Sequence, residues 1–168
     1  MLFQPRKGTK GAEKIFCAFC AFLWLVFSGQ VYAQPFVDDL EQRSFRYFWE
    51  QADPQTGLVP DRARSDGTSL PESHAGVASI AATGFGLTSL CIAADRNWID
   101  RSQALERARN TLRFFDARPF HQRGWFYHWM DSKTGGRRWN SEVSSIDTAL
   151  LLAGVLTVRQ CFRDDREI

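Results

Sequence analysis

Residues 76–94 read GVASIAATGFGLTSLCIAA, and this stretch, which has no charge before Asp95, decides the fold class. Residues 144–162, SSIDTALLLAGVLTVRQCF, have the same character and are nearly uncharged before Arg159. A helix that is apolar on all sides is buried, so both stretches are predicted to be inner helices. Ser79-Ile80 and Ser145-Ile146 occupy similar places in the two stretches, 66 residues apart, which indicates a weak internal repeat.

Two amphipathic helices are predicted beside them, at 38–52 and 100–116. Asp38 or Asp39 can cap the first, and Asp100 with Gln103 resembles a capping box for the second. Apolar residues recur near helical spacing in both segments. In the second they are Ala104, Leu105, Ala108, Leu112 and Phe115. These helices should lie on the outside.

The exception to the helical pattern is 124–139, GWFYHWMDSKTGGRRW. It predicts a short hairpin in which 125–130 returns through 137–139 after a turn at Thr134-Gly135-Gly136. A strand pleat would place Trp125, Tyr127 and Trp129 on one face. His128 would then face the opposite side.

Alternating outer and inner helices in repeated hairpins are what an α/α toroid needs. The predicted fold class is therefore all-α, the N-terminal part of an (α/α)6 toroid with one short β-hairpin. A closed ring of twelve helices needs at least ~200 residues at common helix and loop lengths. This chain supplies four helices, so it is expected to be a fragment or to fold differently from a complete toroid.

The first 33 residues have the features of a secretory signal peptide. Four basic residues in 1–14 precede an uncharged run at 15–28, and Val31-Tyr32-Ala33 supplies the small residues of a cleavage site before Gln34. A membrane anchor, the alternative, needs ~20 apolar residues, and this run breaks at Gly29-Gln30. We therefore expect a periplasmic or secreted domain at 34–168 that has no stable membrane anchor after cleavage.

Removal of 1–33 changes the charge balance. It takes four of 21 basic residues and one of 19 acidic residues, which leaves 17 against 18. Composition thus gives no reason to expect a nucleic-acid partner. Cys91 and Cys161 are too few for a disulfide scaffold and are expected to be buried thiols.

The densest polar cluster is 137–147, RRWNSEVSSID. Glu142 lies just before the inner helix and is the better catalytic candidate, although a solvated loop acid fits the spacing too. Asp147 fits a capping box with Ser144. Since five helical residues turn through roughly 140°, Glu142 and Asp147 are not expected to form a simple pair on one face.

A second cluster runs from Asp61 to His74, before the other inner helix. Asp61-Arg62 could be a local ion pair, and Glu72 and His74 precede their helix as Glu142 precedes its own. The parallel predicts that both clusters lie at one end of a ring, with ordinary loop polarity as the alternative.

The aromatic residues near these acids suit sugar rings, with core packing as the alternative for most of them. Trp125, Trp139 and Asn140 are the candidates for substrate binding beside the acids. The three histidines, at 74, 121 and 128, have no metal-ligand spacing, so neither a metal site nor a cofactor is expected.

Four blocks in order resemble the bacterial glycoamylase-like family of candidate glucoamylases. They are FRYFWEQADPQTGLVPDR, SIAATGFGLTSL, GWFYHWMDSKTG and WNSEVSSIDTALLLAG. That family is similar to β-1,2-glucanases and to the hydrolase domain linked with cyclic β-1,2-glucan synthases. The resemblance covers residues 36–168.

The resemblance implies an exported (α/α)6 toroid that hydrolyses a glucan by means of two carboxyl groups. Glu142 and Asp147 match the acids of the family's block, and Asp61 and Arg62 of VPDR are weaker binding candidates. Family members continue for several hundred residues, so part of the ring and a further catalytic carboxylate are expected to be missing here. An inactive truncated chain and a non-catalytic carbohydrate-binding module are the alternative functions.

Overall fold

The computed structural model describes residues 35–117 and 121–168. The chain divides into two units, Met1–Glu41 and Gln42–Ile168. In the first unit the described residues, 35–41, are helical. The predicted signal peptide, 1–33, lies outside the described residues, and everything that follows concerns the second unit.

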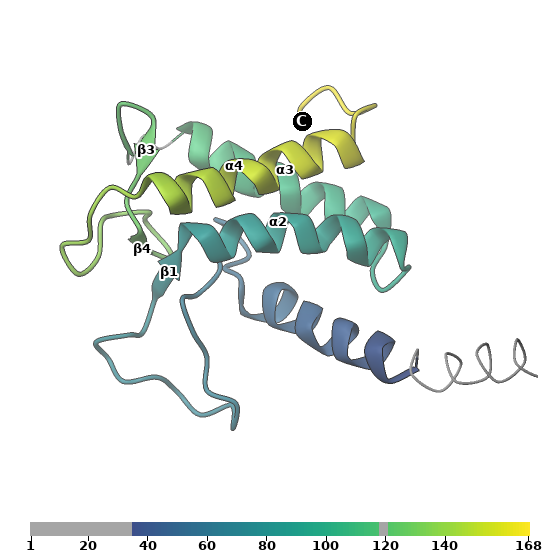
Figure 1. The fold of residues 1–168 in the computed structure, drawn as a ribbon, viewed down its shortest axis with the longest axis horizontal. Helices are drawn as coiled ribbons and strands as arrows, with labels where there is room; N and C mark the ends of the chain where they lie inside the picture. The colour runs from purple at the N-terminus through teal and green to yellow at the C-terminus, as the bar shows by residue number, and fades with distance from the viewer. Residues whose placement is uncertain (1–34, 118–120) are drawn as a thin grey trace, which may run out of the picture. The chain divides into compact units, whose positions relative to one another are not determined.

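The second unit is mainly helical, as the sequence predicts, with small pieces of sheet at one end of its helices (Figure 1). The first helix continues to residue 51. The other elements, in chain order, are β1 (Val77–Ser79), α2 (Ile80–Asp95), α3 (Arg101–Ala117), β2 (His121–Gln122), β3 (Trp125–Phe126), β4 (Trp129–Asp131) and α4 (Ser145–Cys161).

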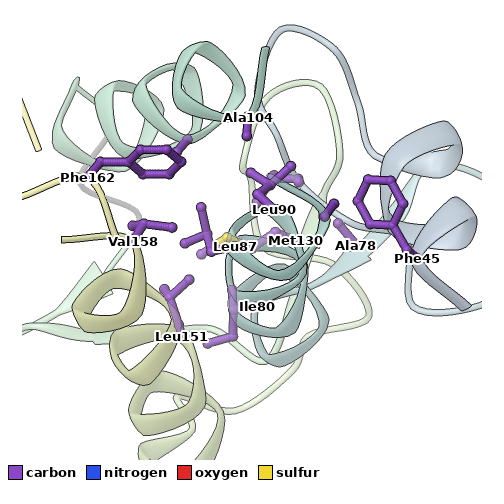
Figure 2. Packing of buried hydrophobic residues seen from close by; sticks show 13 residues of the cluster. Phe45, Ala78, Ile80, Leu87, Leu90, Ala104, Met130, Leu151, Val158 and Phe162 are labelled. Carbon is purple, nitrogen blue, oxygen red and sulfur yellow. The ribbon is translucent and has the colours of Figure 1, made fainter. Parts of the chain in front are cut away.

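The helices α2 and α4 lie side by side and begin at the same end, beside β1 and β4 (Figure 1). Apolar residues from both form one core with α3 and Met130 of β4, and Figure 2 shows how they interlock. The central side chains are Ile80, Leu87 and Leu90 of α2 and Leu151 and Val158 of α4. The amphipathic prediction for α3 is confirmed, because Ala104, Ala108 and Thr111 are buried.

Full burial of α2 and α4 was an expectation that the described residues do not meet. Phe85 and Ile92 of α2 are 53% and 46% exposed, and Ile146 and Leu156 of α4 are 74% and 62% exposed. Each helix therefore buries one side in the core and leaves apolar side chains on another. Despite this apolar character, the described part of the chain holds no helix with the length and hydropathy needed to cross a membrane.

The prediction of helix from residue 76 is wrong for the first residues of that segment. Residues 77–79 form β1, which pairs antiparallel with β4. The helix begins only after Ser79, whose side chain accepts a hydrogen bond from the Ala82 N–H as an N-cap. An uncharged apolar run does not distinguish strand from helix, so the partner strand decided the outcome.

The hairpin prediction is correct at its turn and incomplete elsewhere. Met130 and Arg137 form an isolated antiparallel bridge across the 134–136 turn. However, β4 pairs chiefly with β1, and β3 pairs with β2. The sheet region is thus two two-stranded sheets rather than a single hairpin.

One row of paired residues crosses four segments. Pro60 pairs with Ala78, Ala78 with Met130, and Met130 with Arg137, each in antiparallel fashion. This ladder brings the VPDR loop beside the segment that leads to α4. The two polar clusters, distant in the sequence, therefore lie near the same ends of α2 and α4.

Candidate functional site

The site is built where α4 begins. The segment 126–128 pairs with 142–144: the His128 N–H donates to the Glu142 carbonyl at 3.1 Å, and the Ser144 N–H donates to the Phe126 carbonyl at 3.0 Å. Tyr127 and Val143 form the bridge between them. This pairing fixes the backbone of Glu142 against that of His128, just ahead of the helix.

The His128 imidazole lies between two carboxylates. Its Nδ1 is 3.2 Å from Glu142 Oε1 and 3.5 Å from Asp147 Oδ2. Glu142 and Asp147 were not expected to lie on one face, because that expectation applied helical geometry to both residues. Glu142, however, precedes α4. Both candidate acids thus reach one imidazole, with Glu142 67% exposed and Asp147 16% exposed.

The pKa of Glu142 is lowered. Its own backbone N–H is the main cause, and the hydrogen bond from His128 adds to it. A carboxyl with a lowered pKa is ionised at neutral pH, so its chemistry is that of a base or an anionic contact. A general acid would need the opposite shift.

Asp147 has a structural role at the start of α4. Ser144 is the N-cap, and its Oγ accepts a hydrogen bond from the Asp147 N–H at 3.2 Å. The Ser144 hydroxyl in turn donates to Asp147 Oδ2. The predicted capping box is therefore half formed, because the Ser144 N–H donates to the Phe126 carbonyl and not to Asp147. Asp147 also adds negative charge in the first turn, where the helix dipole favours it.

Four aromatic rings connect the two polar clusters. His128 stacks on Trp129 with centroids 3.8 Å apart, Trp129 meets Trp139 edge-on at 5.1 Å, and Trp139 meets His74 at 5.0 Å. We call these four residues the ring row. Trp139 is fixed to the second cluster through its Nε1–H, which donates to the Ser73 carbonyl at 2.9 Å.

Asp61 contacts the ring row through Trp129. Trp129 Nε1–H donates to Asp61 Oδ1 at 3.1 Å, and Arg62 pairs with Asp61 Oδ2 at 2.6 Å. The predicted local ion pair is therefore present. Arg62 and His74 also line an open pocket of about 400 Å³, whose wall includes Thr68 and Ser69. A pocket with mixed polar and apolar walls thus adjoins one end of the ring row.

Trp139 and Asn140 have unusual backbone conformations. Both are left-handed, with φ of 52°, which non-glycine residues adopt at a cost of about 1–3 kcal/mol each. The Arg137 guanidinium supports this turn by donating to the carbonyls of Asn140 and Ser141. The turn presents the Trp139 ring, which is 40% exposed, to the ring row.

The predicted strand faces are wrong at His128, and Trp125 does not join the ring row. The chain bends at His128 between β3 and β4, so this ring stacks on Trp129 instead of facing away. Trp125 is 46% exposed and lies in β3 opposite Gln122. Sequence reasoning missed His128 as a site residue, and its only sequence signal was its position among the aromatics.

The described residues hold no group of three or more His, Cys, Asp or Glu side chains that could bind a metal ion. The arrangement instead offers an ionised carboxylate, an imidazole and aromatic faces around an open surface. These groups can bind a neutral polyhydroxylated molecule through hydrogen bonds and ring contacts.

No protein-family model matches the chain. Among curated proteins it is 28% identical, over 138 residues, to an exo β-1,2-glucooligosaccharide sophorohydrolase (non-reducing end) of Parabacteroides distasonis. The match covers 78% of this chain and 18% of that protein, so the chain spans less than a fifth of the relative's length.

The similar solved structures include a β-1,2-glucanase and a candidate glucoamylase. An endo-β-1,2-glucanase from Chitinophaga pinensis, in complex with sophorotriose and glucose, matches with a TM-score of 0.73 and 28% identity over 80% of this chain and 33% of its own. A candidate glucoamylase from Bacteroides caccae matches with a TM-score of 0.68 and 29% identity, covering 77% and 32%. These neighbours confirm the resemblance to glycoamylase-like proteins and β-1,2-glucanases.

Proposed function

We propose that the chain forms part of the sugar site of a glycoside hydrolase that acts on a β-1,2-linked glucan. The similar proteins are described as a β-1,2-glucooligosaccharide hydrolase and an endo-β-1,2-glucanase, the latter bound to sophorotriose. Export to the periplasm or outside the cell follows from the signal-like segment 1–33, and N-terminal sequencing of the exported protein should then begin at Gln34.

The observation that carries the proposal is the convergence of Glu142, His128 and the ring row. Sugar rings present apolar C–H faces and a rim of hydroxyl groups. The exposed Trp139 ring can pack against such a face, while the Glu142 carboxylate can accept hydrogen bonds from hydroxyls. This combination of groups suits an uncharged oligosaccharide.

In this site Glu142 is proposed to act as the base, or as an anion that orients a water or hydroxyl. Its lowered pKa keeps it ionised, so the acid that protonates the leaving oxygen is a different residue. Asp147 is engaged with Ser144 and His128, which favours a supporting role. A two-carboxylate hydrolysis therefore draws its acid from outside the Glu142–Asp147 pair.

We also propose the (α/α)6 toroid for the complete architecture. Its support is the parallel pair of inner helices, and the apolar side chains that α2 and α4 leave exposed. Further helical hairpins would cover these side chains. The chain alone should hydrolyse little or no glucan, because general acid–base catalysis needs both the acid and the base within reach of the substrate.

Binding to the chain as it stands tests the sugar site directly. Sophorotriose should change the fluorescence of Trp129 and Trp139 and give a saturable isotherm, while maltotriose, which has α-1,4 linkages, should not. Glu142→Gln should weaken the binding and leave the circular dichroism unchanged. Equal responses to both trisaccharides would favour a general carbohydrate-binding module, and no response to either would contradict the proposed site.

A further inference from the structure

Two cysteines that are 70 positions apart meet between α2 and α4. Cys161 lies near enough to Cys91 to raise the pKa of its thiol. Cys91 Sγ is also 3.9 Å from the Thr157 carbonyl, to which it can donate. Thr157 lies one turn before Cys161 on α4, so Cys91 packs against this turn. Both thiols are free and half-buried.

The backbones of α2 and α4 are in contact about two turns before the cysteines. A Cβ atom on Gly84 would lie 2.3 Å from the Leu150 carbonyl oxygen, so the two backbones touch at this point. Cys91 follows Gly84 by seven residues, and Cys161 follows Gly154 by seven. Seven residues make almost two complete turns and advance about 10.5 Å, so both cysteines continue the same contact line.

Other uses of two adjacent thiols fit this place less well. A structural zinc or iron site needs three or four ligands, and the described residues contain no such group. Burial, followed by the contact with Cys161, raises the pKa of Cys91, so this thiol is a poor nucleophile in the folded chain. Neither metal binding nor nucleophilic catalysis is therefore favoured, whereas two free thiols on neighbouring turns of packed helices suit a disulfide.

We propose that Cys91 and Cys161 form a disulfide when the chain folds in the presence of a disulfide oxidant such as glutathione disulfide. In this step the Cys91–Cys161 S–S bond forms and the oxidant's S–S bond breaks. The two cysteine thiols lose two electrons and two protons, and the oxidant becomes two thiols. Because the folded state suppresses the Cys91 thiolate, the exchange takes place mainly during folding.

This link joins α2 and α4 at the ends far from the ring row. It closes a long loop, which restricts the unfolded chain more than the folded one. The disulfide should therefore raise the midpoint of thermal unfolding by roughly 5–15 °C while leaving sophorotriose binding unchanged. This inference does not depend on the proposed sugar site.

The test is to refold the full chain with glutathione disulfide, alkylate the remaining thiols, and digest with trypsin without reduction. The expected product is a linked pair of peptides, residues 65–96 and 160–163, lighter by two hydrogens than the separate peptides. A Cys17→Ser/Cys20→Ser variant should give the same pair, since it removes the other two cysteines.

Reduction should remove the linked peptide and lower the unfolding midpoint of this variant. The same reductant should not lower the midpoint when Cys161→Ser is added. Alkylation of Cys91 and Cys161 in most refolded molecules would overturn the proposal. So would a linked product that joins either residue to Cys17 or Cys20 in the unmodified chain.

Discussion

Gly84 and Gly154 touch where α2 packs on α4, and neither position has room for a side chain. A Cβ atom on Gly154 would lie 2.2 Å from the Gly84 carbonyl oxygen, and one on Gly84 would lie 2.3 Å from that of Leu150. Both obstacles are backbone atoms, which cannot rotate away. The two glycines therefore set the distance between α2 and α4, and the site lies where these two helices begin.

Substitution of either glycine by alanine should separate the helices. We expect Gly84→Ala or Gly154→Ala to reduce the free energy of unfolding by about 2–4 kcal/mol, measured by urea denaturation. The matched control is Ala149→Gly at an exposed position of α4, which should cost about 1 kcal/mol through helix propensity alone. Stabilisation by Gly84→Ala would show that propensity outweighs the contact.

Glu142→Gln should slow catalysis strongly and spare the fold. In a protein that supplies the rest of the ring, for example with residues 34–168 in place of the matching third of the endo-β-1,2-glucanase, turnover should fall ~10²–10⁴-fold. Reducing ends released from β-1,2-glucan measure this. Asp147→Asn is the control, because its capping role predicts lost stability before lost chemistry. Unchanged turnover with Glu142→Gln would remove this residue from the site.

The pH dependence of sugar binding should reveal the contact between His128 and Glu142. Because the pKa of Glu142 is lowered, sugar binding that needs its anion persists as the pH falls below the usual range of glutamate. His128→Gln removes one of the two main causes of this shift, so the acidic limb of the binding curve should move to higher pH. Calorimetric titrations with sophorotriose at several pH values measure it, and an unmoved limb would contradict the contact.

Trp139 should contribute to sugar binding through its exposed ring. Trp139→Ala is expected to raise the dissociation constant for sophorotriose roughly three- to tenfold, in line with the strength of single aromatic contacts. Trp125→Ala is the matched control, since that ring is also exposed but lies outside the ring row. If the two variants lost affinity equally, the ring row would not be the binding surface.

Acid should weaken the fold through Asp53, which is almost completely buried and contacts Lys133. Burial alone raises the pKa of Asp53, but the Lys133 ammonium and two backbone N–H donors outweigh it and lower the pKa. The stability supplied by this carboxylate is therefore present above the unfolded pKa of about 3.9 and is lost as the pH falls through the lower folded value.

Asp53→Asn keeps the shape of the side chain and removes its charge. It should cost about 1–3 kcal/mol at neutral pH and progressively less in strong acid, as the pH falls below the folded pKa of Asp53 and the carboxyl becomes protonated in both states. Urea denaturation at neutral pH and in strong acid measures the difference. A cost that stayed equal under the two conditions would exclude the carboxylate charge as its source.

Local sequence patterns were enough to predict where most of the helices lie, but not all of their caps. Asp38 and Asp39, the candidate caps of the first helix, lie inside it, because the chain is already helical at residue 35. Apolar spacing placed α3 within a residue at each end, and Ser144 with Asp147 marked the start of α4. At the predicted capping box of α3, the Asp100 N–H donates to Gln103 Oε1 at 3.2 Å. These features depend on residues three or four positions apart, which the order of residues specifies directly.

The sequence by itself therefore determined a mainly helical chain with Glu142 just before a helix. Only the tertiary structure made 77–79 a strand, because a continuous apolar run fits either conformation until a partner such as β4 pairs with it. It alone placed His128 between two carboxylates, since a bend in the chain overrode strand alternation. It also brought Cys91 against the turn of α4 that leads to Cys161, because helices joined through some 50 intervening residues meet by packing, which no local pattern encodes.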